Sequence, residues 1–202
     1  MAIKIIPVNK SNIFEWRSSV RTVFGDIPSK DVVIRMVNER FMIDYDHWNE
    51  QSDRLIAAFD TESEQIVGSG GADKYNITVP GGNNIKMAGI AYMGTLPTHK
   101  RRGIFSSMMK KLHQQAKERG DAIAGLWASQ SLLYSRFGYG LATMREDWSI
   151  DTNHTSLSTD RPTGISLKLV DKNKALNEIP KIYEIFRKCQ NGATDRTQGY
   201  WN

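Results

Sequence analysis

Apolar residues alternate in some stretches of the chain and recur at helical spacing in others, so the first half divides into clear segments. Ala2–Val8 alternates and is rich in β-branched residues, which predicts a strand. Apolar residues recur at helical spacing, as a helical stripe, in Ile13–Phe24 and in Ser29–Arg40, which predicts two helices. Asp44–Trp48 has no clear period and indicates an irregular stretch or short helix. The chain therefore opens with a strand and two helices.

Strand patterns dominate the next forty residues. Leu55–Phe59, Ile66–Val79 and Ile85–Leu96 each read as a strand. Turn residues at Thr61–Ser63 and Pro80–Gly82 separate them. Because short turns join neighbouring antiparallel strands, this order predicts a three-stranded meander.

A basic loop, Pro97–Gly103, leads into a helical face that Gly120 ends. The apolar positions of that face are Ile104, Phe105, Met108, Met109, Leu112 and Ala116. The later segments are predicted to be a buried strand, a short helix and a last strand, at Ile123–Trp127, Ser131–Arg136 and Gly140–Ile150. The predicted order is strands, a crossover helix and then further strands. This order predicts an α/β layered domain.

A change of composition indicates a domain boundary. Asp151–Gly164 is crowded with Thr, Ser, Asn and Pro and is predicted to be a linker. We therefore expect one domain over residues 1–150, a linker over 151–164 and the incomplete start of a second domain over 165–202. That last part holds the apolar run Ile165–Val170 and a helical stripe, Ala175–Phe186, which is marginal for a separate core. The aromatic pair Tyr200 and Trp201 indicates that it is cut short or packs back on the first domain.

Composition excludes several classes of protein. The 202 residues are 40% hydrophobic with a formal net charge of +5, typical of a globular protein with a moderate preference for anionic partners. A lone Cys189 cannot form an intrachain disulfide, and no apolar run is long enough to cross a membrane, so we expect a cytoplasmic protein without membrane partners. The basic run His99–Arg102 lacks interleaved aromatics, so we expect no nucleic-acid partner. We expect no metal site, because the four histidines are scattered: His47, His99, His113 and His154.

The basic loop carries the clearest chemistry. Lys100, Arg101 and Arg102 stand where a strand leads into a helix, beside unpaired backbone N–H groups and the positive end of the helix dipole. Gly103 lets a ligand approach the backbone without a Cβ in the way. This pattern predicts a phosphate or pyrophosphate site, the alternative being a solvated basic helix start. No Gly-x-x-x-x-Gly-Lys-Ser/Thr or Gly-x-Gly-x-x-Gly motif occurs, which disfavours ATP and NAD. The strand before the loop, Tyr92–Leu96, is predicted to splay from the next strand and leave backbone groups free for an amide-bearing ligand.

Three segments resemble a known family: Tyr92–Ile104 (YMGTLPTHKRRGI), Trp127–Ser129 and Leu133–Gly140 (LYSRFGYG). Their order and spacing are similar to those of the GNAT superfamily of acetyltransferases, and more narrowly to its enhanced-intracellular-survival (Eis) branch. The resemblance covers most of residues 1–150. It implies the GNAT acyl-CoA N-acyltransferase fold, an α+β arrangement in which helices flank a mixed, mostly antiparallel sheet.

The resemblance implies acetyl-CoA as the cofactor. Met93 and Thr95 would contact the pantetheine and acetyl group through their backbone, and Ser129 would also belong to the cofactor site. The pyrophosphate would be held by Lys100, Arg101, Arg102, Gly103 and Ile104. The sequence departs from the superfamily pattern Gln/Arg-x-x-Gly-x-Gly/Ala at both ends, with Lys100 first and Phe105 last. Lysine supplies charge there without the bidentate fork of arginine.

Tyr134 stands where the family has its general acid, and a phenol stays protonated at neutral pH. From the pattern alone, a core tyrosine is the alternative for Tyr134. Asp26 matches an acidic position of the family's substrate pocket and could attract a cationic amine, although a helix-end aspartate is the alternative. The general base of the Eis branch looks to be the C-terminal carboxylate of a further domain, which the pattern of this chain does not include.

The resulting hypothesis is an acetyl-CoA-dependent N-acetyltransferase. It would move an acetyl group to a primary amine of a cationic small molecule or peptide, by direct transfer through a tetrahedral intermediate. The alternative is a non-catalytic CoA-binding module that lacks the base. A homo-oligomer is expected if the whole-protein architecture of Eis-like relatives is present.

Overall fold

The computed structural model describes residues 2–39, 52–144, 146–154, 164, 166–196 and 198–201. The irregular stretch predicted at Asp44–Trp48, with His47, lies outside these residues. The strands are β1 Ile3–Pro7, β2 Leu55–Asp60, β3 Gln65–Thr78, β4 Asn84–Thr95 and β5 Ile123–Gly125. The α-helices are α1 Ile13–Val23, α2 Lys30–Val37, α4 Ile104–Glu118, α5 Lys172–Cys189 and α6 Gln198–Trp201. Short 3-10 turns are η2 Ser52–Arg54, η3 Pro97–His99, η4 Ser131–Leu133, η5 Ser135–Phe137 and η6 Thr152–His154.

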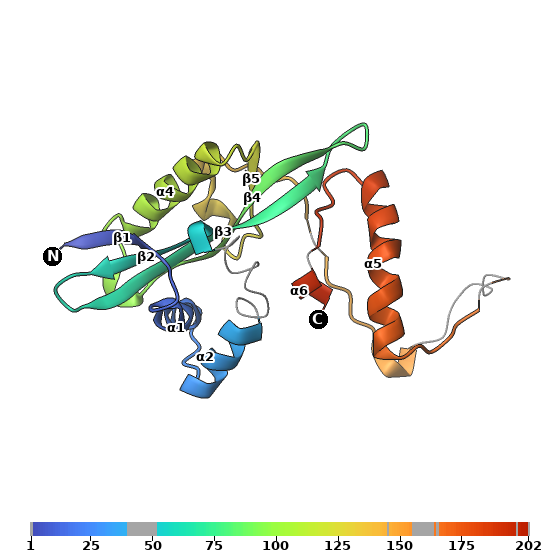
Figure 1. Cartoon of the computed structure of the whole chain (residues 1–202), viewed down its shortest axis with the longest axis horizontal. Helices are drawn as coiled ribbons and strands as arrows, with labels where there is room; N and C mark the ends of the chain where they lie inside the picture. The colour runs from blue at the N-terminus through green and yellow to red at the C-terminus, as the bar shows by residue number, and fades with distance from the viewer. Residues whose placement is uncertain are drawn as a thin grey trace.

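The described strands form one sheet in the order β1-β2-β3-β4-β5 (Figure 1). β1 to β4 pair antiparallel, and β5 joins β4 in parallel after the crossover through α4. The predicted meander is therefore confirmed as β2, β3 and β4. The α+β class with a mixed, mostly antiparallel sheet is confirmed as well.

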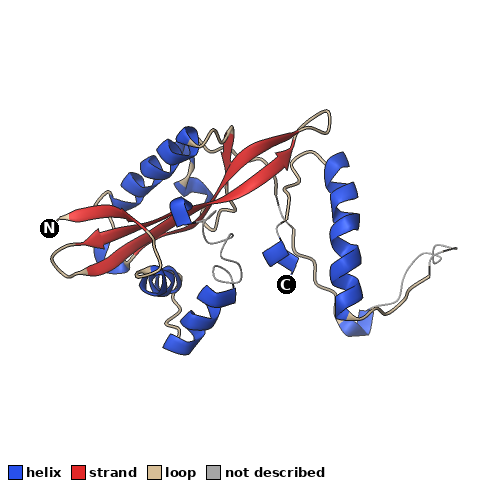
Figure 2. Cartoon of the chain, in the orientation of Figure 1, coloured by secondary structure: helices blue, strands red, loops and turns tan. Residues whose placement is uncertain are grey.

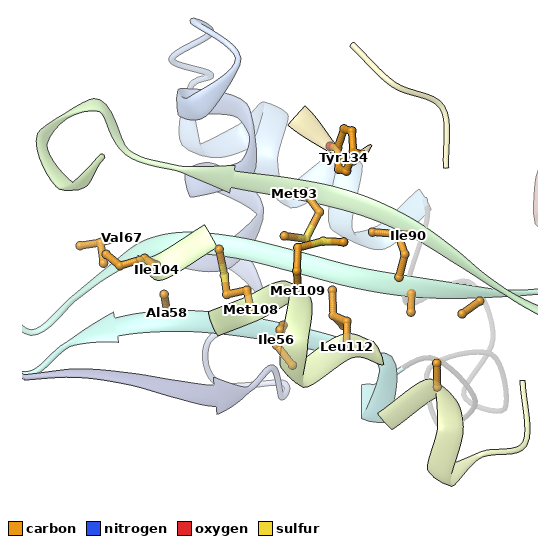
Figure 3. Close-up of a cluster of buried hydrophobic side chains, with 13 residues drawn as sticks. Ile56, Ala58, Val67, Ile90, Met93, Ile104, Met108, Met109, Leu112 and Tyr134 are labelled. Carbon is orange, nitrogen blue, oxygen red and sulfur yellow. The ribbon is translucent and has the colours of Figure 1, made fainter. Parts of the chain in front are cut away.

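Helices cover both faces of the sheet, with α4 on one face and α1 and α2 on the other (Figures 1 and 2). Successive residues of β2 point to opposite faces, as the pleat requires. Ile56 and Ala58 pack in the cluster under α4, whereas Leu55 and Ala57 pack with Trp16 of α1. The predicted face of α4 is buried in the first cluster through Met108, Met109 and Leu112 (Figure 3).

The segment after α4 differs from the sequence prediction. β5 has only three residues, and Ile123 is 42% exposed, so the strand predicted to be buried at Ile123–Trp127 is short and half-exposed. The helix predicted at Ser131–Arg136 is instead the pair of 3-10 turns η4 and η5. The last strand predicted at Gly140–Ile150 is wrong, because the described residues there have no regular structure. A strand forms only against a partner, and the short β5 offers none at that point.

The C-terminal segment packs back on the long β3–β4 hairpin, beside which α5 runs in Figure 1. Thr78 donates its backbone N–H to the carbonyl of Ala193, and Thr194 forms a bridge with Ile77. Arg187 of α5 is buried and donates to Asn84 Oδ1 at 2.7 Å. The helical stripe predicted at Ala175–Phe186 is thus confirmed within α5, whereas residues 166–170 have no regular structure. The domain limits at 150 and 165 stay a prediction, because residues 155–163 are outside the described part.

Candidate active site

β4 and β5 pair at one end only. Their parallel pairing runs from Met87–Ile123 to Gly89–Gly125 and stops there. On its other edge β4 continues to pair with β3 as far as Thr95. From Ile90 onward, β4 therefore has no strand beside it on the β5 side within the described part of the chain. The predicted splay at Tyr92–Leu96 is present, and it leaves backbone groups of β4 available to a ligand.

Met93 and Thr95, the two predicted cofactor contacts on this strand, lie at the open edge with little exposed surface. The side chain of Met93 belongs to the core cluster under α4. The hydroxyl Oγ1 of Thr95 is buried and has no hydrogen-bond partner among the described residues. A buried hydroxyl without a partner is costly, so this atom is a ready contact for a polar group of a ligand.

The predicted basic loop directly follows β4 and has two left-handed residues. Arg101 has φ 61° and Gly103 has φ 76°, and α4 begins at the next residue, Ile104. Arg101 is not a glycine, so its conformation is uncommon and belongs to a tight, specific turn. Lys100, Arg101 and Arg102 are all exposed. Successive turns of this kind, at the start of a 15-residue helix, gather backbone N–H groups and positive charge, an arrangement that suits an anion.

His99 attaches this loop to the end of β2, at the same end of the sheet where β4 ends. Its Nε2 lies 3.4 Å from Oδ2 of Asp60, a buried residue at the end of β2, and its Nδ1 lies 2.8 Å from the hydroxyl of Thr98. Asp60 also accepts hydrogen bonds from the backbone of Glu62 and the hydroxyl of Ser63. The pKa of Asp60 is lowered, mainly by the Glu62 N–H bond, with Ser63 and His99 acting in the same direction. The loop is thus fixed by contacts 39 residues apart in the sequence.

Tyr134 packs against the start of α4. Its ring centroid lies 6.0 Å from that of Phe105, which also contacts Phe137 at 5.9 Å. Phe105 directly follows Ile104, so this aromatic contact joins the basic loop to the predicted general acid. Tyr134 and Met93 also belong to the same buried cluster (Figure 3). The structure therefore brings the open strand, the loop and Tyr134 together.

Burial raises the pKa of Tyr134, so the phenol keeps its proton at neutral pH. Tyr139 packs edge-on against Tyr134, with ring centroids 6.0 Å apart. Burial raises the pKa of Tyr139 to about 12, with the neighbouring Tyr134 adding to the shift. The Tyr139 hydroxyl lies 2.8 Å from Nε2 of His113, whose pKa is lowered by burial.

Two predicted site residues remain, Ser129 and Asp26. Ser129 is exposed in the segment between β5 and η4. Asp26 follows α1 and accepts hydrogen bonds from the guanidinium of Arg21, so its charge is already paired. The pairing reduces the attraction of Asp26 for a cationic amine.

A cleft of about 440 Å³ opens between α1 and α2. It is lined by Phe14, Ser18, Pro28, Lys30, Val33 and Ile34. None of the predicted site residues lines it. Its apolar walls and single cation do not suit a cationic acceptor.

Two further features, a metal-binding group and a membrane-spanning helix, were sought among the described residues. They contain no group of three or more His, Cys, Asp or Glu residues that could hold a metal ion. Among the same residues, no helix is both long and apolar enough to cross a membrane.

Sequence reasoning missed three contributors: Asp60, Phe105 as a packing partner of Tyr134, and the pair Tyr139–His113. In the sequence Phe105 is an apolar position of the helix and a departure from the superfamily motif, and neither feature indicates a contact with Tyr134. Each contact joins residues far apart in the chain, and local spacing carries no signal for such pairs. A histidine inside a basic loop was the one available hint, since imidazole nitrogens often bond carboxylates.

Three features together are typical of the GNAT class of acyl-transferring domains. They are the open edge of β4, the basic loop with its two residues of left-handed φ, and the helix α4 that begins directly after that loop. Residues 4–142 match the family model described as "Acetyltransferase (GNAT) domain". The chain therefore belongs to the GNAT acetyltransferase family.

Within that family the chain is similar to Eis proteins. It is 32% identical over 142 residues to the N-acetyltransferase Eis of Mycobacterium tuberculosis, covering 68% of this chain and 35% of Eis. It is 33% identical over 188 residues to an uncharacterized N-acetyltransferase of Streptomyces coelicolor, covering 92% of this chain and 43% of the relative. The crystal structure of Eis1 from Mycobacterium abscessus has the same fold, with a TM-score of 0.74 at 24% identity, over 99% of this chain and 46% of that one. The chain spans less than half the length of these relatives.

Proposed function

We propose that this chain carries the acetyl-CoA site of an N-acetyltransferase that acetylates a primary amine of a cationic acceptor. The observation that carries the proposal is the contact of Phe105 with Tyr134, which joins the basic loop to a protonated phenol beside the open edge of β4. The named N-acetyltransferase relatives support the same reaction class.

The residues fit the cofactor in three places. The side chains of Lys100, Arg101 and Arg102 offset the charge of a pyrophosphate, and backbone N–H groups at the start of α4 donate to it. Gly103 has no atom within 4 Å of the position that a Cβ would occupy, so the backbone there can be approached closely. The partnerless hydroxyl of Thr95 and the free edge of β4 suit the amide groups of pantetheine. Bound acetyl-CoA supplies the activated thioester.

Tyr134 holds a proton at its phenol oxygen, which it donates to the departing sulfur. A positioned acid of this kind contributes about 10² to 10⁴ in rate. Transfer would be direct, without an acyl-enzyme: the amine nitrogen would bond to the acetyl carbon as the C–S bond breaks. The proton that the amine loses would pass to solvent water, from which the Tyr134 phenol would regain its proton. Backbone N–H groups at the open edge of β4 would stabilise the oxygen that develops negative charge.

A second candidate, a CoA-binding module without transfer, is favoured by one observation. Asp26, the acidic residue that the resemblance gives to the substrate pocket, is paired with Arg21. That module binds acetyl-CoA and leaves every amine unmodified.

Thiol release from acetyl-CoA against a panel of amines separates the two candidates. The panel includes an aminoglycoside, a polyamine, a lysine peptide and an arylalkylamine. Release above the amine-free rate with at least one acceptor, and acetylation of that acceptor by mass spectrometry, is the expected result. Cofactor binding without release for any amine would leave the binding module as the function.

A further inference from the structure

The free edge of β4 contains a bulge. In the β3–β4 ladder Gly71 pairs with Ala91 and Ser69 with Gly94, so Gly70 alone faces both Tyr92 and Met93. Tyr92 has φ 60°, a left-handed conformation that a bulky residue rarely adopts. A bulge redirects the backbone groups of its strand, and bulges recur beside active sites. This one lies on the stretch of β4 that has lost its pairing with β5.

Side-chain contacts hold Tyr92 in this conformation. Its hydroxyl donates to the carboxylate of Asp73, with oxygens 3.3 and 3.2 Å away. Its ring meets that of Trp16 edge-on, with centroids 5.2 Å apart. Trp16 is fully buried and is itself fixed, because its indole N–H donates to the carbonyl of Ile56 at 2.9 Å.

The backbone of the bulge is held separately. Ser69 is fully buried on β3, and its hydroxyl donates to the carbonyl of Tyr92 at 2.8 Å. Gly70 leaves room for Met93, because a Cβ at Gly70 would lie 2.7 Å from the Met93 sulfur. A Cβ at Gly71 would lie 2.9 Å from the ring of Tyr92. The two neighbouring glycines therefore accommodate the bulge while Ser69 and Asp73 fix it.

We infer that Tyr92, Asp73 and Ser69 are positioning residues, and that they aim the backbone groups of Met93 to Thr95 at the acyl-pantetheine arm of the cofactor. The inference rests on the proposed function, because it assigns these residues to that site. None of the three is a catalytic residue. These residues should therefore affect binding of the acyl-pantetheine arm along β4. They should not affect binding of the nucleotide half at the basic loop.

The test compares binding of two ligands by calorimetry: acetyl-CoA, and the 3′-phospho-ADP half of coenzyme A, which lacks the arm. Tyr92→Phe removes only the hydroxyl, and Ser69→Ala removes only the bond to the Tyr92 carbonyl. Each variant is expected to weaken acetyl-CoA binding about tenfold, the effect of one hydrogen bond, and to leave binding of the nucleotide half within about twofold of wild type. Tyr183→Phe is the matched control, since it also removes a tyrosine hydroxyl bond, to Thr194 on the C-terminal segment, and changes neither affinity.

Asp73→Leu keeps the approximate size of the side chain and removes the hydrogen-bond acceptor, so it provides a second variant if Tyr92→Phe fails to fold. It is expected to show the same selective loss. Equal losses for both ligands, or no loss for acetyl-CoA, would overturn the inference while leaving the proposed function intact. Failure of the wild-type chain to bind either ligand would overturn both.

Discussion

Phe105 and Tyr134 pack with ring centroids 6.0 Å apart and planes inclined at 57°. Phe105 stands in the first turn of α4, immediately after the basic loop, and Tyr134 follows η4 on the far side of β5 in the sequence. The contact therefore fixes the distance between the predicted anion site and the predicted acid. A small residue, which the superfamily pattern has at this position, could not make it.

Removing the Phe105 ring should loosen Tyr134 more than it weakens the cofactor site. Phe105→Ala is expected to destabilise the chain by about 1–3 kcal/mol, less than a fully buried phenylalanine, and to lower turnover about tenfold. Urea unfolding and thiol-release kinetics measure the two effects. Phe105→Leu keeps most of the packing volume and serves as the control. Unchanged turnover in the alanine variant would mean that the aromatic contact does not position Tyr134.

Removing the Tyr134 hydroxyl tests the acid directly. Tyr134→Phe keeps the ring and its packing, so acetyl-CoA affinity and thermal stability should stay near wild type. Turnover with any accepted amine should fall by about 10² or more. Tyr139→Phe, which removes the neighbouring hydroxyl, is the matched control and should lower turnover much less. Equal effects of the two substitutions would argue against a specific role for Tyr134.

The lowered pKa of Asp60, caused mainly by the hydrogen bond from the Glu62 N–H and also by Ser63 and His99, predicts a pH dependence of folding. Because the pKa of Asp60 is lowered in the folded chain, the unfolded chain takes up a proton first, at its ordinary value of 3.8. This stabilisation is complete above that pH and is lost as the pH falls through the lower folded pKa. Asp60→Asn should flatten the acid side of the stability profile, measured by urea unfolding between about pH 3 and 7.

Gly94 predicts a steric coupling between β4 and α1. A Cβ at Gly94 would lie 2.9 Å from Cβ of Val23 and closer still to one of its methyl groups. Gly94→Ala should therefore destabilise the chain by about 1–3 kcal/mol. Val23→Ala should recover part of that loss in the double variant, which a double-mutant cycle of unfolding free energies measures. Strictly additive effects would show that α1 does not press on β4 at this point.

The fold was predictable where local pattern decides the structure. Alternating apolar residues predicted the meander β2–β3–β4. The helical spacing of Met108, Met109 and Leu112 predicted the buried face of α4. The strand predicted at Gly140–Ile150 failed, because alternation describes a strand only when a partner strand is present. Trp148, an apolar residue of that pattern, is 86% exposed.

The site was predictable in its residue types but not in its contacts. The charges of Lys100–Arg102 and the left-handed freedom of Gly103 follow from short-range sequence. The positive φ of Tyr92 does not, because it depends on Ser69, Asp73 and Trp16 from other elements. The pairing of Asp26 with Arg21 was also unforeseen, although the two residues are close in sequence.

The pyrophosphate site on the basic loop is best tested by calorimetry. Binding of acetyl-CoA is measured for the wild-type chain and for a triple variant, Lys100→Ala, Arg101→Ala, Arg102→Ala. All three side chains are exposed, so the variant should keep the wild-type fold, which circular dichroism checks. A pyrophosphate site on this loop predicts micromolar binding to the wild type and a loss of at least about a hundredfold in the variant, since each charge-assisted hydrogen bond contributes about 1.5–3 kcal/mol. Equal affinity for both chains, or no binding by a folded wild type, would contradict a pyrophosphate site on this loop.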